Sequence, residues 1–143
     1  MTQIDFYTHV ADKLRVACTV AAKAHAQGMR VYVLCPDPDT AQRFDRMLWT
    51  TPATGFVPHC AARDPLAAMT PVIVDCTGDE PPHDEVLVNL RGDSPAFFPR
   101  FERLIEIVSL DEDDRARARE RFRFYRDRGY ELRSHDLSKT GGQ

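Results

Sequence analysis

Short apolar segments alternate with longer amphipathic segments along most of this chain. Residues 31–35 are apolar throughout, which is typical of a strand buried on both faces of a sheet. In residues 12–27 the apolar positions recur every three or four residues, and Gly28 follows at a place where helices commonly end. This alternation predicts an α/β fold: a Rossmann-like domain whose parallel or mixed central sheet is flanked by helices.

The other elements follow from the same two periodicities. Strands are predicted at residues 4–7, 71–76, 85–90, 104–110 and 130–137. A helix is predicted after a turn at residues 36–39 and runs to about Trp49, and either Asp37 or Asp39 can cap its first turn. Another helix is predicted over residues 111–128, because acids open this segment and arginines close it, as the helix dipole favours.

Length and composition limit the setting in which this chain works. Its 143 residues suit one domain over residues 1–143, with residues 138–143 expected as a frayed tail. No apolar run approaches the roughly 20 residues that a membrane helix needs. Asp5 interrupts the segment where a secretory signal would be apolar. We therefore expect a cytoplasmic protein with no membrane partner.

Metal-binding and catalytic patterns are weak. Cys18, Cys35, Cys60 and Cys76 form no C-x-x-C pair, so buried thiols are expected rather than zinc ligands. The acids between residues 75 and 85 fit a solvated loop better than a metal site. No serine lies in a nucleophile-elbow context, and we predict no catalytic residue and no metal.

A Rossmann-like order of elements raises the question of whether this chain binds a nucleotide. Residues 8–11 contain no glycine, and residues 36–40 carry Asp37 and Asp39 where a phosphate-binding loop would carry glycines. The sequence therefore predicts no cofactor. A nucleotide-dependent α/β enzyme is kept as an alternative, because fold alone does not decide function.

Charge is distributed unevenly, although the net charge is only −3. Residues 111–114 are all acidic, whereas residues 115–128 are rich in arginine. On a helix, one face would carry Arg115, Arg119, Arg123 and Arg126.

Phe122 lies on the flank of this arginine face, towards the side expected to meet the core. Arginine forks bind carboxylates and phosphates alike, and an apolar edge beside them favours a peptide with both acids and a hydrophobic anchor. Two alternatives are a solvated face paired with the acids at 111–114, and direct binding of single-stranded DNA. The acidic net charge and the few stacking aromatics disfavour DNA.

A second feature is a pair of aromatic residues. Trp49 and Phe56 lie at and just after the end of a predicted helix, and residues 50–58 are expected to be irregular. Aromatic residues on a loop are favoured anchors for a protein partner. The alternative is that both rings close the edge of the core.

These features occur within blocks that resemble the chi subunit family of bacterial DNA polymerase III. The blocks are Lys23-Ala24 with Gly28-Met29-Arg30-Val31, Arg43-Phe44-Asp45, Leu48-Trp49, Phe56-Val57-Pro58-His59, Leu87-Val88-Asn89-Leu90, and Ala118 to Arg126 with Gly129-Tyr130. The resemblance covers nearly the whole chain. It implies a non-catalytic adaptor in DNA replication, which links the clamp-loader complex, through its psi subunit, to the single-stranded-DNA-binding protein (SSB). DNA itself would be contacted only indirectly.

The resemblance also implies which residues bind each partner. The SSB C-terminal tail is acidic and ends in phenylalanine, and its binding residues would be Val108, Arg115, Arg119, Phe122, Arg123 and Arg126. Trp49 and Phe56 would bind psi. Arg115 and Arg123 replace lysines of the family pattern. Phe122 replaces a tyrosine, so a hydroxyl contact is lost while the apolar wall remains.

Overall fold

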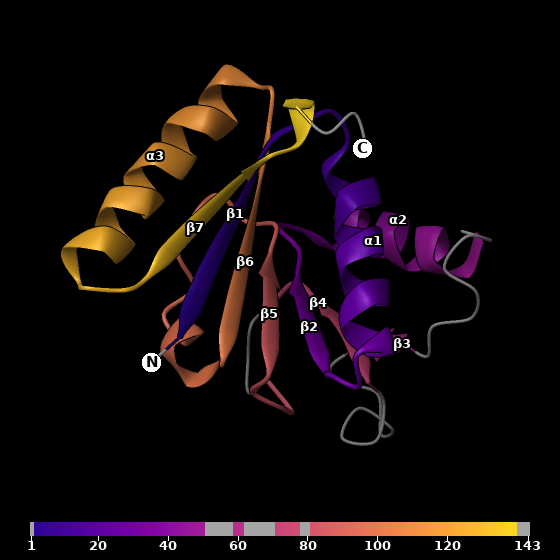
Figure 1. Cartoon of the computed structure of the whole chain (residues 1–143). Coiled ribbons are helices and arrows are strands. Elements are labelled where there is room, and N and C mark those ends of the chain that lie inside the picture. Colours follow the sequence, from indigo (N-terminus) through magenta and orange to yellow (C-terminus); the bar gives the residue numbers. More distant parts are fainter. Residues whose placement is uncertain (1, 51–58, 62–70, 78–80, 140–143) are drawn as a thin grey trace.

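A computed structural model describes residues 2–50, 59–61, 71–77 and 81–139. Within these residues one seven-stranded sheet has the order β3-β4-β2-β5-β6-β1-β7, and all neighbouring strands are parallel (Figure 1). The strands are β1 (Gln3–Val10), β2 (Val31–Leu34), β3 (His59–Ala61), β4 (Val72–Asp75), β5 (Val86–Asn89), β6 (Arg103–Ser109) and β7 (Leu132–Asp136). The predicted Rossmann-like α/β class is confirmed.

Helices cover both faces of the sheet. Helices α1 (Lys13–Ala26) and α2 (Pro38–Thr50) pack on one face, and α3 (Glu112–Asp127) packs on the other (Figure 1). The strand order explains this division. The chain moves from β1 to β2 in one direction along the sheet and from β6 to β7 in the opposite direction. Right-handed crossovers in opposite directions place their helices on opposite faces.

Strand β2 shows how the sheet divides the core into two layers. All four of its residues are buried, as the apolar run predicts. Val31 and Val33 face α1 and α2, whereas Tyr32 and Leu34 face the layer that contains α3. A run without polar residues is required because side chains on both faces are removed from water.

The predicted cap at Asp37 is confirmed, because its side chain accepts a hydrogen bond from the N–H of Thr40. Asp12 and Asp111 also accept a hydrogen bond from the backbone N–H three residues later, although no cap was predicted there. Gly28 and Gly129 adopt φ values of +80° and +85°, which glycine tolerates without steric cost.

The sequence patterns were less accurate at strand boundaries. Strand β7 begins at Leu132 rather than residue 130, and Leu137–Lys139 form a short 3-10 helix, η4. Strand β3 was not predicted, because three residues are too few to show a period. The single-domain boundaries and the frayed tail stay predictions, since residues 140–143 lie outside the described part.

Two of the four cysteines are buried, as expected. Cys18 and Cys35 are buried free thiols, and burial raises the pKa of each to about 12. Cys76 is partly buried. None of the helices in the described ranges is long and apolar enough to cross a membrane.

Candidate peptide-binding site

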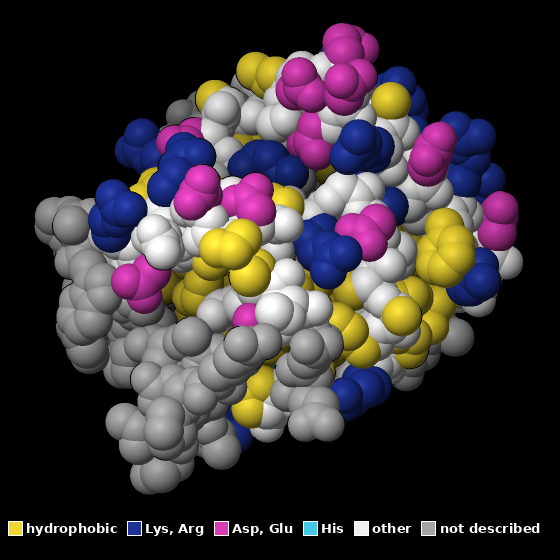
Figure 2. All heavy atoms as spheres, turned by 180° about the vertical axis from the view of Figure 1, so that it is seen from behind, with side chains coloured by type: hydrophobic (Ala, Val, Ile, Leu, Met, Phe, Trp, Pro, Cys, Tyr) yellow, Lys and Arg dark blue, Asp and Glu magenta, His cyan; other side chains and the backbone are white. Residues whose placement is uncertain are grey.

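Helix α3 is held on the sheet by a narrow apolar face. Ala118 and Tyr125 are 5% and 0% exposed, and both pack into the core layer between α3 and the sheet. Acidic side chains are most concentrated at the end of the molecule where α3 begins, and elsewhere on this face lysines and arginines lie among hydrophobic and further acidic side chains (Figure 2). The first turn of the helix is therefore acidic, whereas the rest of it is rich in arginine.

A pocket of about 260 Å³ opens between α3 and strands β1, β6 and β7. We call it the α3 pocket, and its lining residues are Phe6, Thr8, His9, Val108, Arg115, Ala118, Arg119, Phe122 and Ser134. The rings of Phe6 and Phe122 meet edge to face, with their centroids 5.4 Å apart. The pocket combines an apolar interior with two guanidinium groups, and its lining contains no carboxylate.

Four of the residues expected at the tail site line this pocket together: Val108, Arg115, Arg119 and Phe122. Arg123 and Arg126 do not line it, and both are exposed on α3. Arg126 lies 3.3 Å from the carboxylate of Asp127. The structure thus places the expected residues in an inner group at the pocket and an outer group along the helix.

Five lining residues were missed by the sequence patterns, and most come from β1. Phe6, Thr8 and His9 belong to β1, which the sheet order places between β6 and β7. The pairing of β1 with β6 shifts between Tyr7 and Val10, and His9 has a φ of 59°. This irregularity brings Thr8 and His9 to the pocket, and no local signal in the sequence announces it.

Ion pairing with the acids at the start of α3 accounts for little of the arginine charge. Arg115 lies 3.4 Å from Glu112, whose side chain is 83% exposed. Asp114 instead contacts Lys13 at 3.2 Å and accepts hydrogen bonds from the N–H and hydroxyl of Ser109. Burial raises the pKa of Asp114, but these contacts outweigh it, so the pKa lies below its usual value. Within the described residues Arg119 forms no ion pair.

A buried polar network fixes α3 to β6. Glu106 is fully buried, and its carboxylate lies 3.2 Å from Arg121 and accepts hydrogen bonds from Tyr125 at 2.6 Å and Asn89 at 3.1 Å. Arg121 also donates to the carbonyl of Gly92 at 2.8 Å. Burial raises the pKa of Glu106, and the Arg121 guanidinium opposes this effect. The sequence had indicated only that Arg121 was one of several arginines, whereas the structure buries it.

The model of the family described as "DNA polymerase III chi subunit, HolC" matches residues 1–133. The chain belongs to this chi family. Three curated chi subunits are similar to it. The chi subunit of Pseudomonas aeruginosa is 39% identical, over 97% of this chain and 99% of its own length. The Escherichia coli protein is 30% identical over 82% of this chain and 81% of its own length. The Haemophilus influenzae protein is 28% identical over 85% of each. The chi-family chain is an accessory subunit of a replicative polymerase.

The chi-family chain also has the crevice in which Rossmann-like proteins commonly bind ligands. A pocket of about 480 Å³ lies at the carboxyl ends of β1, β2, β5 and β6. Helix N–H groups that would meet a phosphate there already donate to carboxylates: Arg15 to Asp12, and Thr40 to Asp37. The bond from Thr40 lowers the pKa of Asp37. These carboxylates would repel a phosphate.

The predicted psi-binding residues lie largely outside the described part of the chain. Trp49 belongs to the last turn of α2, but its side chain and all of Phe56 lie outside the described residues. The psi-binding prediction is therefore still a prediction. In the described ranges no group of three histidine, cysteine or acidic residues could hold a metal ion.

The hydroxyl of Ser109, a serine at the end of β6, donates a hydrogen bond to Asp114. This contact stabilises the start of α3.

Proposed function

We propose that this chi-family chain is a non-catalytic adaptor that binds the acidic, phenylalanine-terminated tail of SSB in the α3 pocket. Its second partner would be the psi subunit of the clamp-loader complex, through Trp49 and Phe56. The adaptor would then join the clamp loader to SSB-coated DNA without touching the DNA directly.

The observation that carries this proposal is the composition of the α3 pocket. Val108, Ala118 and Phe122, with Phe6, provide an apolar interior for a phenylalanine ring. Arg115 and Arg119 lie at the same pocket, where they suit the terminal carboxylate and nearby aspartates. A ligand that carries an aromatic ring directly beside several carboxylates matches both properties at once.

The outer arginines have a different role in this proposal. Arg123 and Arg126 lie on α3 but outside the pocket lining. They would attract the acidic tail from a distance rather than hold its last residue. Such attraction is screened beyond about 8 Å at physiological ionic strength, so it should depend strongly on salt.

Burial of the terminal ring should depend little on salt, and a buried aromatic anchor commonly contributes about 2 kcal/mol or more. The test is a calorimetric titration with an acidic peptide that ends in phenylalanine, at low and high salt. Arg119→Glu should weaken binding more than Arg119→Ala, and the difference should narrow in high salt. Removing the terminal phenylalanine should abolish most binding at every salt concentration.

Two controls make the titration decisive. Arg100→Glu reverses an exposed charge in the short 3-10 helix η3 (Phe98–Arg100), which does not line the α3 pocket, so it should leave affinity nearly unchanged. An oligonucleotide of similar charge should bind more weakly than the peptide. Equal affinities for wild type and Arg119→Glu, or preference for the oligonucleotide, would refute the proposal.

A further inference from the structure

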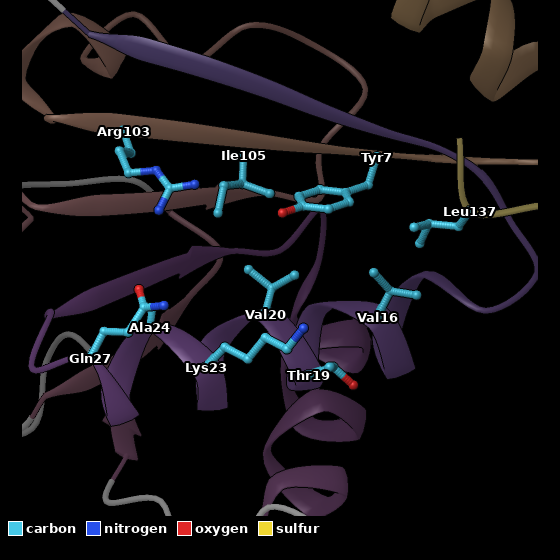
Figure 3. Close-up of a pocket in the computed structure, with 10 residues that line it drawn as sticks. All are labelled: Tyr7, Val16, Thr19, Val20, Lys23, Ala24, Gln27, Arg103, Ile105 and Leu137. Atoms are coloured by element: carbon cyan, nitrogen blue, oxygen red, sulfur yellow. The ribbon is translucent and has the colours of Figure 1, made fainter. Parts of the chain in front are cut away.

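A second amphipathic pocket lies on the opposite face of β1 and β6. It opens between α1 and the sheet and has a volume of about 210 Å³ (Figure 3). We call it the α1 pocket. It shares no lining residue with the α3 pocket, because alternate side chains of a strand point to opposite faces.

The α1 pocket is lined by apolar side chains, with Tyr7, Thr19 and Gln27 as its uncharged polar residues (Figure 3). Its apolar lining consists of Val16, Val20 and Ala24 from α1, Ile105 from β6 and Leu137 from η4. Val20 and Ile105 point towards each other from the helix and from the sheet (Figure 3). Val16, Ala24 and Ile105 are largely buried, whereas Val20 and Leu137 are partly exposed at the opening of the pocket.

The rim of the α1 pocket is basic. Lys23 and Arg103 approach it from opposite walls, and no carboxylate is among its lining residues (Figure 3). Arg103 lies 3.2 Å from Asp5, whose side chain is only 3% exposed and also contacts His135 at 3.0 Å. Lys23 is exposed and forms no ion pair within the described part of the chain. Lys23 is therefore the uncompensated charge, and Arg103 adds a guanidinium that is partly neutralised.

We propose that the α1 pocket is a docking site for an acidic, amphipathic segment of a partner protein. An apolar side chain of that segment would enter between Val20 and Ile105, and a flanking carboxylate would contact Lys23. The α1 pocket shares no lining residue with the α3 pocket, so the inference does not depend on the proposed SSB interaction.

Size and charge together favour this occupant. Sites for small molecules commonly have volumes of about 300–1,000 Å³, whereas the α1 pocket has room for one large side chain. A free anion would gain nothing from the apolar interior, and a basic segment would be repelled by Lys23. An acidic peptide with a hydrophobic anchor uses both properties.

The test uses a short peptide in which one leucine is flanked by aspartates, with both ends capped. Capping removes the terminal carboxylate that the α3 pocket is proposed to bind. Methyl NMR spectra of the full chain then report each pocket separately. Saturable shifts are expected for Val20, Ile105 and Leu137, while Val108 and Ala118 in the α3 pocket stay unchanged. Peptides with serine in place of leucine, or lysines in place of aspartates, should not produce these shifts.

Two charge reversals on the same helix complete the test. Lys23→Glu should weaken binding of the peptide about tenfold, equivalent to about 1.4 kcal/mol. Arg15→Glu changes the charge equally at an exposed position outside the pocket, and should change affinity by less than about twofold.

Four outcomes would overturn the inference. They are no binding, shifts confined to the α3 pocket, equal losses in both variants, and shifts of the same methyl groups with protein concentration alone. The last outcome would identify a second copy of the chain as the occupant. Each can occur whether or not the SSB-tail peptide binds at the α3 pocket.

Discussion

Replacing Glu106 with glutamine should destabilise the fold strongly. The substitution preserves size and an acceptor for the Tyr125 hydroxyl, but it removes the negative charge that faces Arg121. Arg121 is only 4% exposed, so its charge would then be buried without an anionic partner. Leaving one member of a buried ion pair alone typically costs about 3–5 kcal/mol. That is a large part of the roughly 5–15 kcal/mol by which domains are stable.

Urea unfolding followed by far-UV circular dichroism measures this loss. Glu112→Gln is the matched control, because it removes the acidic partner of Arg115 at a site that is 83% exposed. Its free energy of unfolding should change by no more than about 0.5 kcal/mol. If the free energy of unfolding fell no more in Glu106→Gln than in this control, the buried charge of Arg121 would not need Glu106 as its partner. The account of the network would then be wrong.

The converse substitution, Arg121→Met, makes the stability of the protein pH-dependent. Burial already raises the pKa of Glu106, and loss of the guanidinium should raise it further. A carboxyl group whose pKa is higher in the folded state destabilises that state as pH rises from the unfolded pKa, about 4, through the folded pKa. The free energy of unfolding of Arg121→Met should therefore fall further below that of wild type at neutral pH than at pH ~5. If the difference between the two proteins did not change with pH, the expected rise in the pKa of Glu106 would be wrong.

The remaining predictions concern the second surface, the crevice and a helix end. Phe56→Ala should weaken psi binding in a pull-down while leaving the affinity for the SSB-tail peptide intact; loss of both by a folded variant would argue against two separate surfaces. Calorimetry should detect no saturable micromolar site for ATP or NAD, since the crevice has no glycine-rich loop and the N–H groups of Arg15 and Thr40 already donate to Asp12 and Asp37. Gly129→Ala should lower the free energy of unfolding by about 1–2 kcal/mol, because φ at Gly129 is +85°; an unchanged urea midpoint would contradict this strain.

Much of the fold could be predicted because its signals are local. The apolar run of β2, the cap at Asp37 and the glycine after α1 each act within a few residues. Part of the α3 pocket was predictable for the same reason. Arg115, Arg119 and Phe122 share one side of a single helix, so helical periodicity brings them together.

The other side of the α3 pocket could not be predicted from local patterns. Phe6 and His9 are more than 100 positions from α3 along the chain, and they reach it because β1 lies between β6 and β7. Strand order depends on which buried faces pack together across the whole chain. No window of neighbouring residues contains that information.

The burial of Arg121 could not be predicted from local patterns either. By itself the sequence determined that α3 is an arginine-rich helix with Phe122 towards the side that meets the core. Only the tertiary structure decided which arginines line the α3 pocket and which one is buried beside Glu106. Glu106 points from β6 towards α3, and its buried carboxylate attracts Arg121 out of solvent, while Arg119 is left at the α3 pocket. The physical reason is that a buried carboxylate needs a partner, and its position is set by strand pairing rather than by the helix sequence.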